Sequence, residues 1–265
     1  MNAASKKAIL IVSFGTSYEN TRKRTIDAIE RDIADAFPAC PAYRAWTSKM
    51  IIAKLKKRDG IIIHTVKEAM EQMLLDGVTD VIVQPTHVIN GIENDQMKAD
   101  ALSFRDRFSS IVFGNPLLTT EEDNQAVVQA VADEFQGMDQ ETALVLMGHG
   151  TEHYANSVYA ALDYRFKDMG HKNIFLGTVE AYPALDSLLR AADSFQPKKI
   201  VLAPFMIVAG DHAHNDMAGD SPDSWACQFE NAGFEVCPII KGLGEYPGIR
   251  RMYVEHAQKA IDSMK

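Results

Sequence analysis

The sequence contains an internal repeat, and this repeat is the feature that most constrains the fold. The segment Ile9–Thr16 lines up with Leu144–Thr151, and the segment Val81–Glu93 lines up with Val201–His212. Each pair begins with a short apolar run and ends in a glycine-containing turn. Two matches in the same order favour duplication of one structural unit over chance likeness between unrelated segments.

A third match extends the repeat. Gly114–Leu118 resembles Val236–Ile240, and a polar loop and an amphipathic helical pattern follow in each case. The stretch 136–140 is polar and carries a glycine, as is typical of a junction between repeats. We therefore predict an N-terminal lobe over 1–137 and a C-terminal lobe over 138–265.

Short apolar runs alternate with longer segments of helical period along the whole chain. This alternation is typical of βα units built around a mostly parallel sheet. The fold class expected is α/β, with two similar lobes that each hold a four-stranded sheet flanked by helices. Strands are predicted at 8–13, 40–46, 79–84, 110–113, 143–147, 173–179, 199–204 and 235–240, and helices at 19–36, 49–57, 65–76, 94–107, 121–135, 153–168, 183–194, 222–232 and 246–262.

Composition excludes several classes of function. The 265 residues carry a formal net charge of -9, which predicts neither nucleic-acid binding nor attachment to an anionic membrane. No stretch approaches the roughly 20 apolar residues of a membrane span. The three cysteines form no C-x-x-C pair, and the apolar run near the N-terminus is too short for a signal peptide. We expect a cytoplasmic protein, whose apolar fraction would permit a homo-oligomer.

Three residues that can bind metals follow successive strands of the second lobe. His149 follows the strand at 143–147, Glu180 follows the strand ending at 179, and His212 lies beyond the strand at 199–204. Ligands of open α/β sheets bind beyond the carboxyl ends of the strands, so these residues are expected at one rim. Two imidazoles and a carboxylate suit Co²⁺, Ni²⁺, Fe²⁺ or Zn²⁺. In the first lobe the positions of the two histidines hold Phe14 and Glu93.

Other residues offer weaker signals. The Ser13–Ser17 loop (Ser13, Phe14, Gly15, Thr16, Ser17) has N–H groups and hydroxyls suited to a carboxylate or phosphate, although an ordinary turn fits its spacing equally well. The stretch Arg44–Arg58 is the most basic part of the chain and is either a solvated helix face or part of a binding site. His87 is either a further rim ligand or an isolated loop residue. The histidines at 64, 153, 171 and 256 are expected at the surface.

Several motifs together resemble the anaerobic cobalt chelatases of the CbiK type. They are Val12–Ser17, His87–Gly91, Met147–Gly150, Val179–Pro183, Met206–Met217, Asp223–Trp225 and Gly242–Glu245. The resemblance covers nearly the whole chain in order, and Met206–Met217 is its most specific part. It implies the class II chelatase fold, with two similar α/β lobes around a cleft that holds the active site.

The resemblance also implies an activity, the insertion of Co²⁺ into sirohydrochlorin without ATP or an organic cofactor. His149 and His212 would be the catalytic and metal-binding histidines, and Glu180 would complete the metal site. The carboxylates of the tetrapyrrole would meet Ser13, Gly15, Thr16 and Ser17, together with part of the Arg44–Arg58 stretch. A neutral imidazole can accept a pyrrole proton as the metal enters.

Alternatives remain open at this stage. Exported members of the family bind haem through a histidine of the first half, a role open to His87, although no signal peptide is apparent. A tetrapyrrole-binding or metal-carrier protein would need the same residues without insertion activity. A chelatase for Fe²⁺ or Ni²⁺ is equally compatible with His and Glu ligands. A phosphoryl-transfer histidine at 149 is disfavoured because the arginines that such enzymes need are missing from its neighbourhood.

Overall fold

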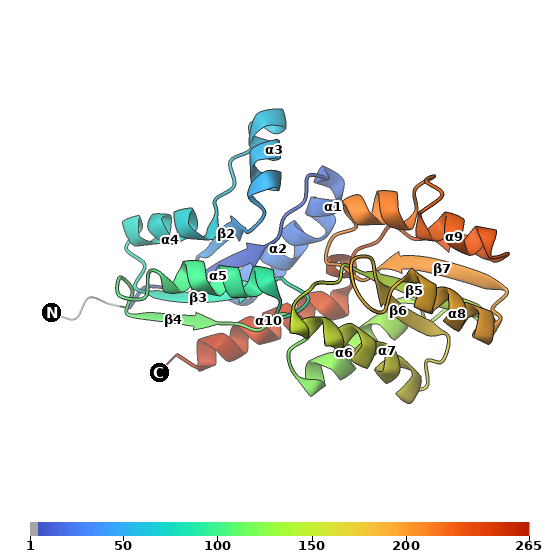
Figure 1. The fold of residues 1–265 in the computed structure, drawn as a ribbon. Coiled ribbons are helices and arrows are strands. Elements are labelled where there is room, and N and C mark those ends of the chain that lie inside the picture. The colour runs from blue at the N-terminus through green and yellow to red at the C-terminus, as the bar shows by residue number, and fades with distance from the viewer. Residues whose placement is uncertain (1–4, 265) are drawn as a thin grey trace. The chain divides into compact units, whose positions relative to one another are not determined.

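A computed structural model describes residues 5–264 (Figure 1). The strands are β1 (Lys7–Ser13), β2 (Ala42–Trp46), β3 (Asp80–Pro85), β4 (Ser110–Phe113), β5 (Thr142–Gly148), β6 (Ile174–Thr178), β7 (Lys199–Pro204) and β8 (Glu235–Pro238). The helices are α1 (Glu19–Arg24), α2 (Ile26–Ala36), α3 (Lys49–Asp59), α4 (Val66–Leu75), α5 (Ile92–Leu102), α6 (Glu121–Glu134), α7 (Ser157–Asp168), α8 (Leu185–Phe195), α9 (Trp225–Asn231) and α10 (Pro247–Asp262), with shorter turns η1 (Tyr154–Asn156), η2 (Ala213–Met217) and η3 (Leu243–Glu245). Within residues 5–264, none of the helices combines the length and apolar character that a bilayer crossing requires.

The strands form two all-parallel, four-stranded sheets, which confirms the expected fold class. The order is β2-β1-β3-β4 in one sheet and β6-β5-β7-β8 in the other, so each strand has the same place in its own sheet. The register agrees as well, because Lys7 pairs with Asp80 as Thr142 pairs with Lys199. The duplication read from the sequence is therefore visible in the backbone.

The third sequence match is shifted relative to the structure. The N–H of Gly114 donates to Val83 and the N–H of Ile239 donates to Leu202, so Gly114 corresponds to Ile239 and not to Val236. The sequence match aligns Pro116 with Pro238. The strand register shows that the corresponding residue of the second repeat lies three positions later than this alignment places it.

The chain divides into two compact units at places that differ from the predicted join. The first unit holds residues 1–119 together with 249–265, and the second holds residues 120–248. The boundaries differ because the helix that follows the fourth strand of each repeat lies in the other unit. The first such helix, α6, lies in the second unit, and α10 lies in the first. A sequence pattern shows that a helix follows a strand but not which sheet it covers, so 137/138 was expected as the boundary.

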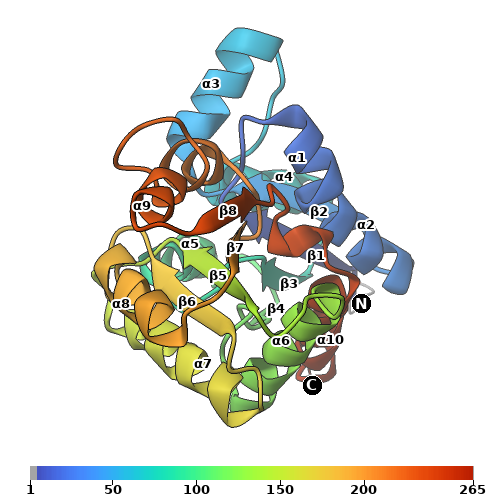
Figure 2. The ribbon, with the colours of Figure 1, turned by 90° about the vertical axis from the view of Figure 1, so that its right-hand side faces the viewer.

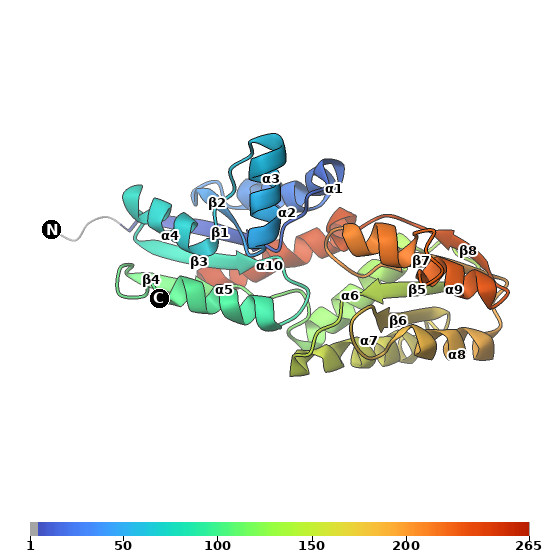
Figure 3. The ribbon, with the colours of Figure 1, turned by 45° about the horizontal axis from the view of Figure 1, so that its top comes forward.

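In the first unit, helices cover both faces of the sheet (Figure 3). Ala8, Leu10 and Val12 of β1 point into a buried cluster with α4 and α5, to which Met70 and Met97 contribute. Side chains alternate along a strand, so Ile9 and Ile11 face the other side. There, α2 and α10 are joined by an ion pair between Asp32 and Arg250, whose Nε lies 2.6 Å from the carboxylate.

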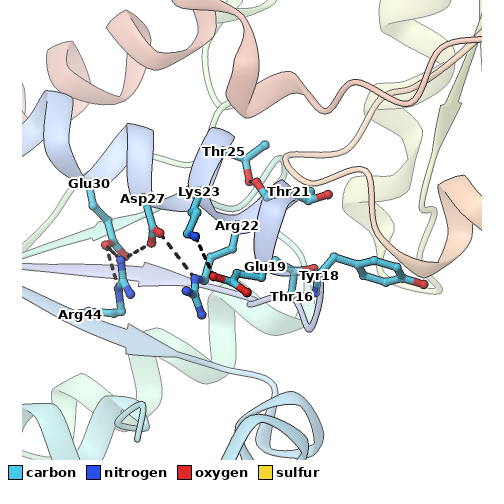
Figure 4. A network of polar contacts seen from close by, with 10 residues as sticks. All are labelled: Thr16, Tyr18, Glu19, Thr21, Arg22, Lys23, Thr25, Asp27, Glu30 and Arg44. Atoms are coloured by element: carbon cyan, nitrogen blue, oxygen red, sulfur yellow. Dashed lines mark hydrogen bonds and ion pairs between the residues drawn. The ribbon is translucent and has the colours of Figure 1, made fainter. Parts of the chain in front are cut away.

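A second polar contact fastens β2 to α2 (Figure 4). The guanidinium of Arg44 binds the carboxylates of Asp27 and Glu30, and its Nε donates to Glu30 at 2.8 Å. Burial raises the pKa of the Glu30 carboxyl, an effect that Arg44 opposes. Arg44 is thus engaged in holding the first unit together.

Helix α3 follows β2 and projects from the first unit (Figure 1). Ser48 caps its N-terminus by accepting from the N–H of Ile51, and Gly60 ends it in the left-handed conformation, with φ of 68°. Leu55 is the buried residue of this helix. Its remaining side chains, including five basic ones, are exposed or half-buried.

The second unit repeats the layered arrangement, with α8 and α9 on one face of its sheet and α6 and α7 on the other (Figure 2). Ala143, Val145 and Met147 of β5 pack with Leu188 of α8 and Phe229 of α9 in one buried cluster. The carboxyl ends of β5, β6 and β7 are left to the loops that carry His149, Glu180 and His212.

Candidate metal and proton-transfer site

Three loops of the second unit bring His149, Glu180 and His212 together. One ligand atom from each residue can be chosen so that all lie within 4.8 Å of one another. The two imidazole rings meet edge to face, with centroids 4.7 Å apart. The side chains are 46%, 53% and 32% exposed respectively, so the group is open to solvent. Three such groups could hold a metal ion and leave further coordination positions open.

Hydrogen bonds define which nitrogen of each histidine is available. Nδ1 of His149 lies 2.9 Å from the carbonyl oxygen of Gly150, and Nδ1 of His212 contacts a carboxylate oxygen of Asp216. Both partners can only accept, so each Nδ1 must carry the proton. The neutral rings therefore keep their lone pairs on Nε2, which suits metal binding and proton acceptance alike.

The loop after β5 owes its shape to a glycine. Gly150 has φ of 88°, and a Cβ there would lie 2.9 Å from the backbone nitrogen of Ala181. The two loops are joined further by the N–H of Glu180, which donates to the carbonyl of His149 at 2.9 Å. Close approach of the loops thus requires glycine at position 150.

Asn156 ties the same two loops together and was not singled out by sequence reasoning. Its side-chain oxygen accepts from the N–H of Thr151 at 3.1 Å, and its nitrogen donates to the carbonyl of Tyr182 at 2.7 Å. The residue thereby holds the loops of His149 and Glu180 at a fixed separation. Spacing in the sequence gave no signal for it, because its two partners lie 5 and 26 residues away.

The Ser13–Ser17 loop of the first unit displays less than its composition suggests. Ser13 and Thr16 are buried, the hydroxyl of Ser13 accepts from Thr86, and that of Thr16 accepts from the N–H of Tyr18. Gly15 has φ of 105° and packs against Trp46, while Ser17 is half-buried. Binding of substrate carboxylates by this loop stays a prediction, with the backbone and Ser17 as its available groups.

His87 is a buried residue of the first unit. Its side chain is 9% exposed and neither ring nitrogen reaches solvent. Burial lowers the pKa of the imidazole to about 4, an effect that the Asn94 side chain opposes. His87 is therefore neutral at physiological pH. Because both ring nitrogens are buried, neither is presented at the surface to a haem iron or a tetrapyrrole.

His256 departs from the expected surface position. It is 2% exposed, and its Nδ1 lies 3.0 Å from the carbonyl of Asn115. The residue lies on the buried face of α10, which the sequence assigned to the wrong lobe. The prediction of a solvated histidine was wrong, because the sequence does not show which sheet α10 packs against and therefore which of its faces is buried.

Only part of the basic stretch is available for a ligand. Arg44 is paired within the first unit, and Arg58 binds Asp59 and the carbonyl of Ser17. Lys49 and Lys56 instead line a shallow groove between α3 and the segment after it. The cavity is about 240 Å³ in volume, and its lining is completed by Ile52, Ala53, Ile62, Ile63, His64, Thr65 and Glu68.

The family model for cobalt chelatase, CbiK, matches residues 7–262 of the chain. The chain belongs to the CbiK cobalt chelatase family. Two curated relatives of this CbiK-family protein carry the name sirohydrochlorin cobaltochelatase. That of Salmonella typhimurium is 40% identical over 97% of both chains. That of Nitratidesulfovibrio vulgaris, named CbiKC, is 30% identical over 98% of this chain and 92% of the relative.

Solved structures agree with the fold of this CbiK-family protein. SirB of Bacillus subtilis, in a structure with Fe³⁺, aligns with a TM-score of 0.63 at 14% identity over 97% of both chains. CbiX, described as the terminal enzyme of sirohaem biosynthesis in denitrifying bacteria, aligns with a TM-score of 0.56 at 17% identity over 96% of this chain and 99% of the other. These likenesses support the class II chelatase fold.

Proposed function

We propose that the protein inserts Co²⁺ into sirohydrochlorin without ATP. One observation carries the proposal, namely that a ligand atom of each of His149, Glu180 and His212 lies within 4.8 Å of the others. The names of the curated relatives support the choice of substrate and metal. The proposed site needs no nucleotide, and the loop after β1 contains neither a G-x-G-x-x-G motif nor a Walker lysine.

The reaction asks two things of these residues. The ion must be held weakly enough to pass to the macrocycle, and two pyrrole protons must leave as it enters. Glu180 reduces the net charge of the bound ion and, with Nδ1 of His149 3.4 Å from Oε2, helps to orient that ring. An imidazole whose Nε2 is released by the departing ion is then able to accept a pyrrole proton.

The groove beside α3 provides a place for substrate carboxylates. The protein has a net charge of -9, so an anionic tetrapyrrole is repelled over most of its surface. Lys49 and Lys56 line this groove, and among residues 5–264 Glu68 is the one carboxylate in its lining. These two lysines are accordingly assigned to attract the substrate.

The test is a metallation assay under anaerobic conditions. Purified protein is mixed with sirohydrochlorin and Co²⁺, and the absorption spectrum of the macrocycle is followed against a sample without protein. Accelerated conversion supports a chelatase. A spectrum of bound pigment with no acceleration supports a tetrapyrrole carrier, and absence of binding rules out both.

Two extensions sharpen the assay. Repeating it with Fe²⁺ and Ni²⁺ ranks the metals, because the ligand set alone does not choose among them. His149→Ala and His212→Ala should abolish the acceleration, while His171→Ala, a half-buried histidine elsewhere in the second unit, should retain it. Wild-type rates in both site variants would show that the insertion site lies elsewhere.

A further inference from the structure

A carboxylate lies next to one of the two metal-site histidines. The Oδ2 of Asp216 contacts the Nδ1 of His212, four residues earlier in the chain. Both side chains are partly open to solvent, with 32% of His212 and 45% of Asp216 exposed. Asp216 occupies Nδ1, so Nε2 is the ring nitrogen of His212 that is left for an ion.

An uncommon backbone turn brings this carboxylate into place. His212 immediately precedes η2, a single π-helical turn in which the N–H of Ala218 donates to the carbonyl of Ala213 at 3.3 Å. Gly219 permits the turn to close, since a Cβ there would lie 2.4 Å from the carbonyl oxygen of Asn215. Single π-helical turns of this kind are frequent at functional sites.

The first unit lacks both the turn and the carboxylate. Its equivalent helix starts in the same way, because the N–H of Asp95 donates to Gly91 as that of His214 donates to Gly210. It then continues as the regular helix α5, and the position of Asp216 is taken by the fully buried Met97. The scaffold alone therefore does not call for an acid there.

We propose that Asp216 is a positioning residue for His212, holding its proton on Nδ1 and directing Nε2 at the ion. The proposal rests on the proposed function for its metal. An ionised carboxylate accepts and cannot donate, so it selects one tautomer of the neutral ring and fixes the ring plane. Partners of this kind are known to orient histidine ligands in carboxylate–histidine–metal arrangements.

The two histidines then differ in their support. Nδ1 of His149 is hydrogen-bonded to the carbonyl of Gly150 and lies 3.4 Å from the Glu180 carboxylate, whereas Nδ1 of His212 contacts the Asp216 carboxylate directly. A charge-assisted hydrogen bond is roughly twice as strong as a neutral one. His212 is thereby the more firmly oriented ligand of the pair.

The test compares Asp216→Ala and Asp216→Asn with Asp220→Ala, which removes an exposed carboxylate four residues further on. The first measurement is the ¹⁵N chemical shift of the His212 ring in metal-free protein at pH 8, assigned by its loss in His212→Gln. We expect the Nδ1–H tautomer in wild type and Asp220→Ala, and a mixture in Asp216→Ala. Asp216→Asn should keep the tautomer in part, because its amide oxygen still accepts.

The second measurement is Co²⁺ affinity, followed through the visible absorption of the bound ion. Asp216→Ala should weaken Co²⁺ binding about 10- to 100-fold and raise the KM for Co²⁺ while leaving the KM for the macrocycle unchanged. An unaltered tautomer with wild-type Co²⁺ affinity in folded Asp216→Ala would overturn the proposal. If wild type inserts no metal but Asp216→Ala still shifts the tautomer and weakens Co²⁺, the positioning role stands and the proposed function fails. Should Asp216→Ala not fold, the Co²⁺ affinity of Asp216→Asn decides, because its neutral amide cannot form the charge-assisted hydrogen bond and wild-type affinity would overturn the proposal.

Discussion

The two units have the same backbone at their rims but different side chains. Beyond the paired strands, the N–H of Ser48 donates to Phe14 at 3.2 Å, and the N–H of Glu180 donates to His149 at 2.9 Å. Phe14 and Ser48 thus take the places of His149 and Glu180. A βα sheet determines where a site can form, and the few residues beyond its strands determine which chemistry forms there.

The side chains at the first rim cannot form a comparable metal site. Phe14 is 43% exposed and offers no ligand atom, and Ser48 is buried as the cap of α3. Glu93, the counterpart of His212, lies exposed in the first turn of a regular helix. The second rim therefore carries three side chains that can bind a metal, whereas the first carries Phe14, Ser48 and Glu93 in their places.

The strongest way to break this asymmetry is to give the second rim the residues of the first. His149→Phe combined with His212→Glu should lower the rate of Co²⁺ insertion by about 10²- to 10⁴-fold, because both imidazoles able to accept a proton are removed. The measurement is the anaerobic rate of spectral change of sirohydrochlorin.

Stability provides the control for that variant. Both side chains are substantially exposed, so the thermal unfolding midpoint should change little. A double variant that remains folded and still inserts Co²⁺ at the wild-type rate would show that the difference between the rims is unrelated to activity.

Glycines at equivalent positions test what the rims share. Gly15 and Gly150 both have positive φ, and a Cβ on Gly15 would lie 2.5 Å from the ring of Trp46. Alanine at either position should cost about 2 to 5 kcal/mol of unfolding free energy, from the unfavourable backbone and the clash. Urea unfolding measures this loss.

Co²⁺ binding separates the two glycine variants. Gly150→Ala should also weaken Co²⁺ binding, since it displaces the loops of His149 and Glu180, whereas Gly15→Ala should bind Co²⁺ as wild type does. Equal loss of Co²⁺ affinity in both variants would argue that the metal site depends on the first unit.

The sequence predicted the scaffold and the convergence of His149, Glu180 and His212, because both leave local signals. All eight strands lie where apolar runs were read, and the ligands follow strand ends, where the topology of a parallel sheet brings them together. The exchange of α6 and α10 between units, the burial of His256 and the contact between Asp216 and His212 were missed. Each depends on which surfaces meet in three dimensions, and periodicity within a segment carries no information about its partner.

His87 should make the stability of the protein depend on pH, whereas the equivalent residue of the second unit cannot. Its counterpart in the second unit is Met206, since their carbonyls accept from Leu117 and Leu243 in the same way. The pKa of folded His87 is lowered from 6.5 to about 4, so the unfolded chain binds the proton more readily. Stability that is present above about pH 6.5 is then lost as the pH falls through about 4, by up to about 3 kcal/mol.

The variant His87→Met removes this titratable side chain. Its unfolding free energy should fall less than that of wild type between pH 6.5 and pH 4, as measured by urea titrations at several pH values. His171→Met, in which a half-buried histidine is replaced, should follow wild type. Parallel curves for wild type and His87→Met would mean that folding does not lower the pKa of His87.

The smallest effect concerns α3, the helix that follows β2 and has no counterpart directly after β6. Lys49→Ala combined with Lys56→Ala should raise the KM for sirohydrochlorin about two- to tenfold, since exposed ionic contacts contribute up to about 1 kcal/mol each. The kcat and the affinity for Co²⁺ should stay as in wild type.

Lys57→Ala is the matched control, because this exposed lysine belongs to the same helix but does not line the groove. The difference between double variant and wild type should shrink at high salt, which screens exposed charges. A KM that rises equally in Lys57→Ala would indicate general attraction by a basic helix, and an unchanged KM in the double variant would remove the groove from the substrate-binding surface.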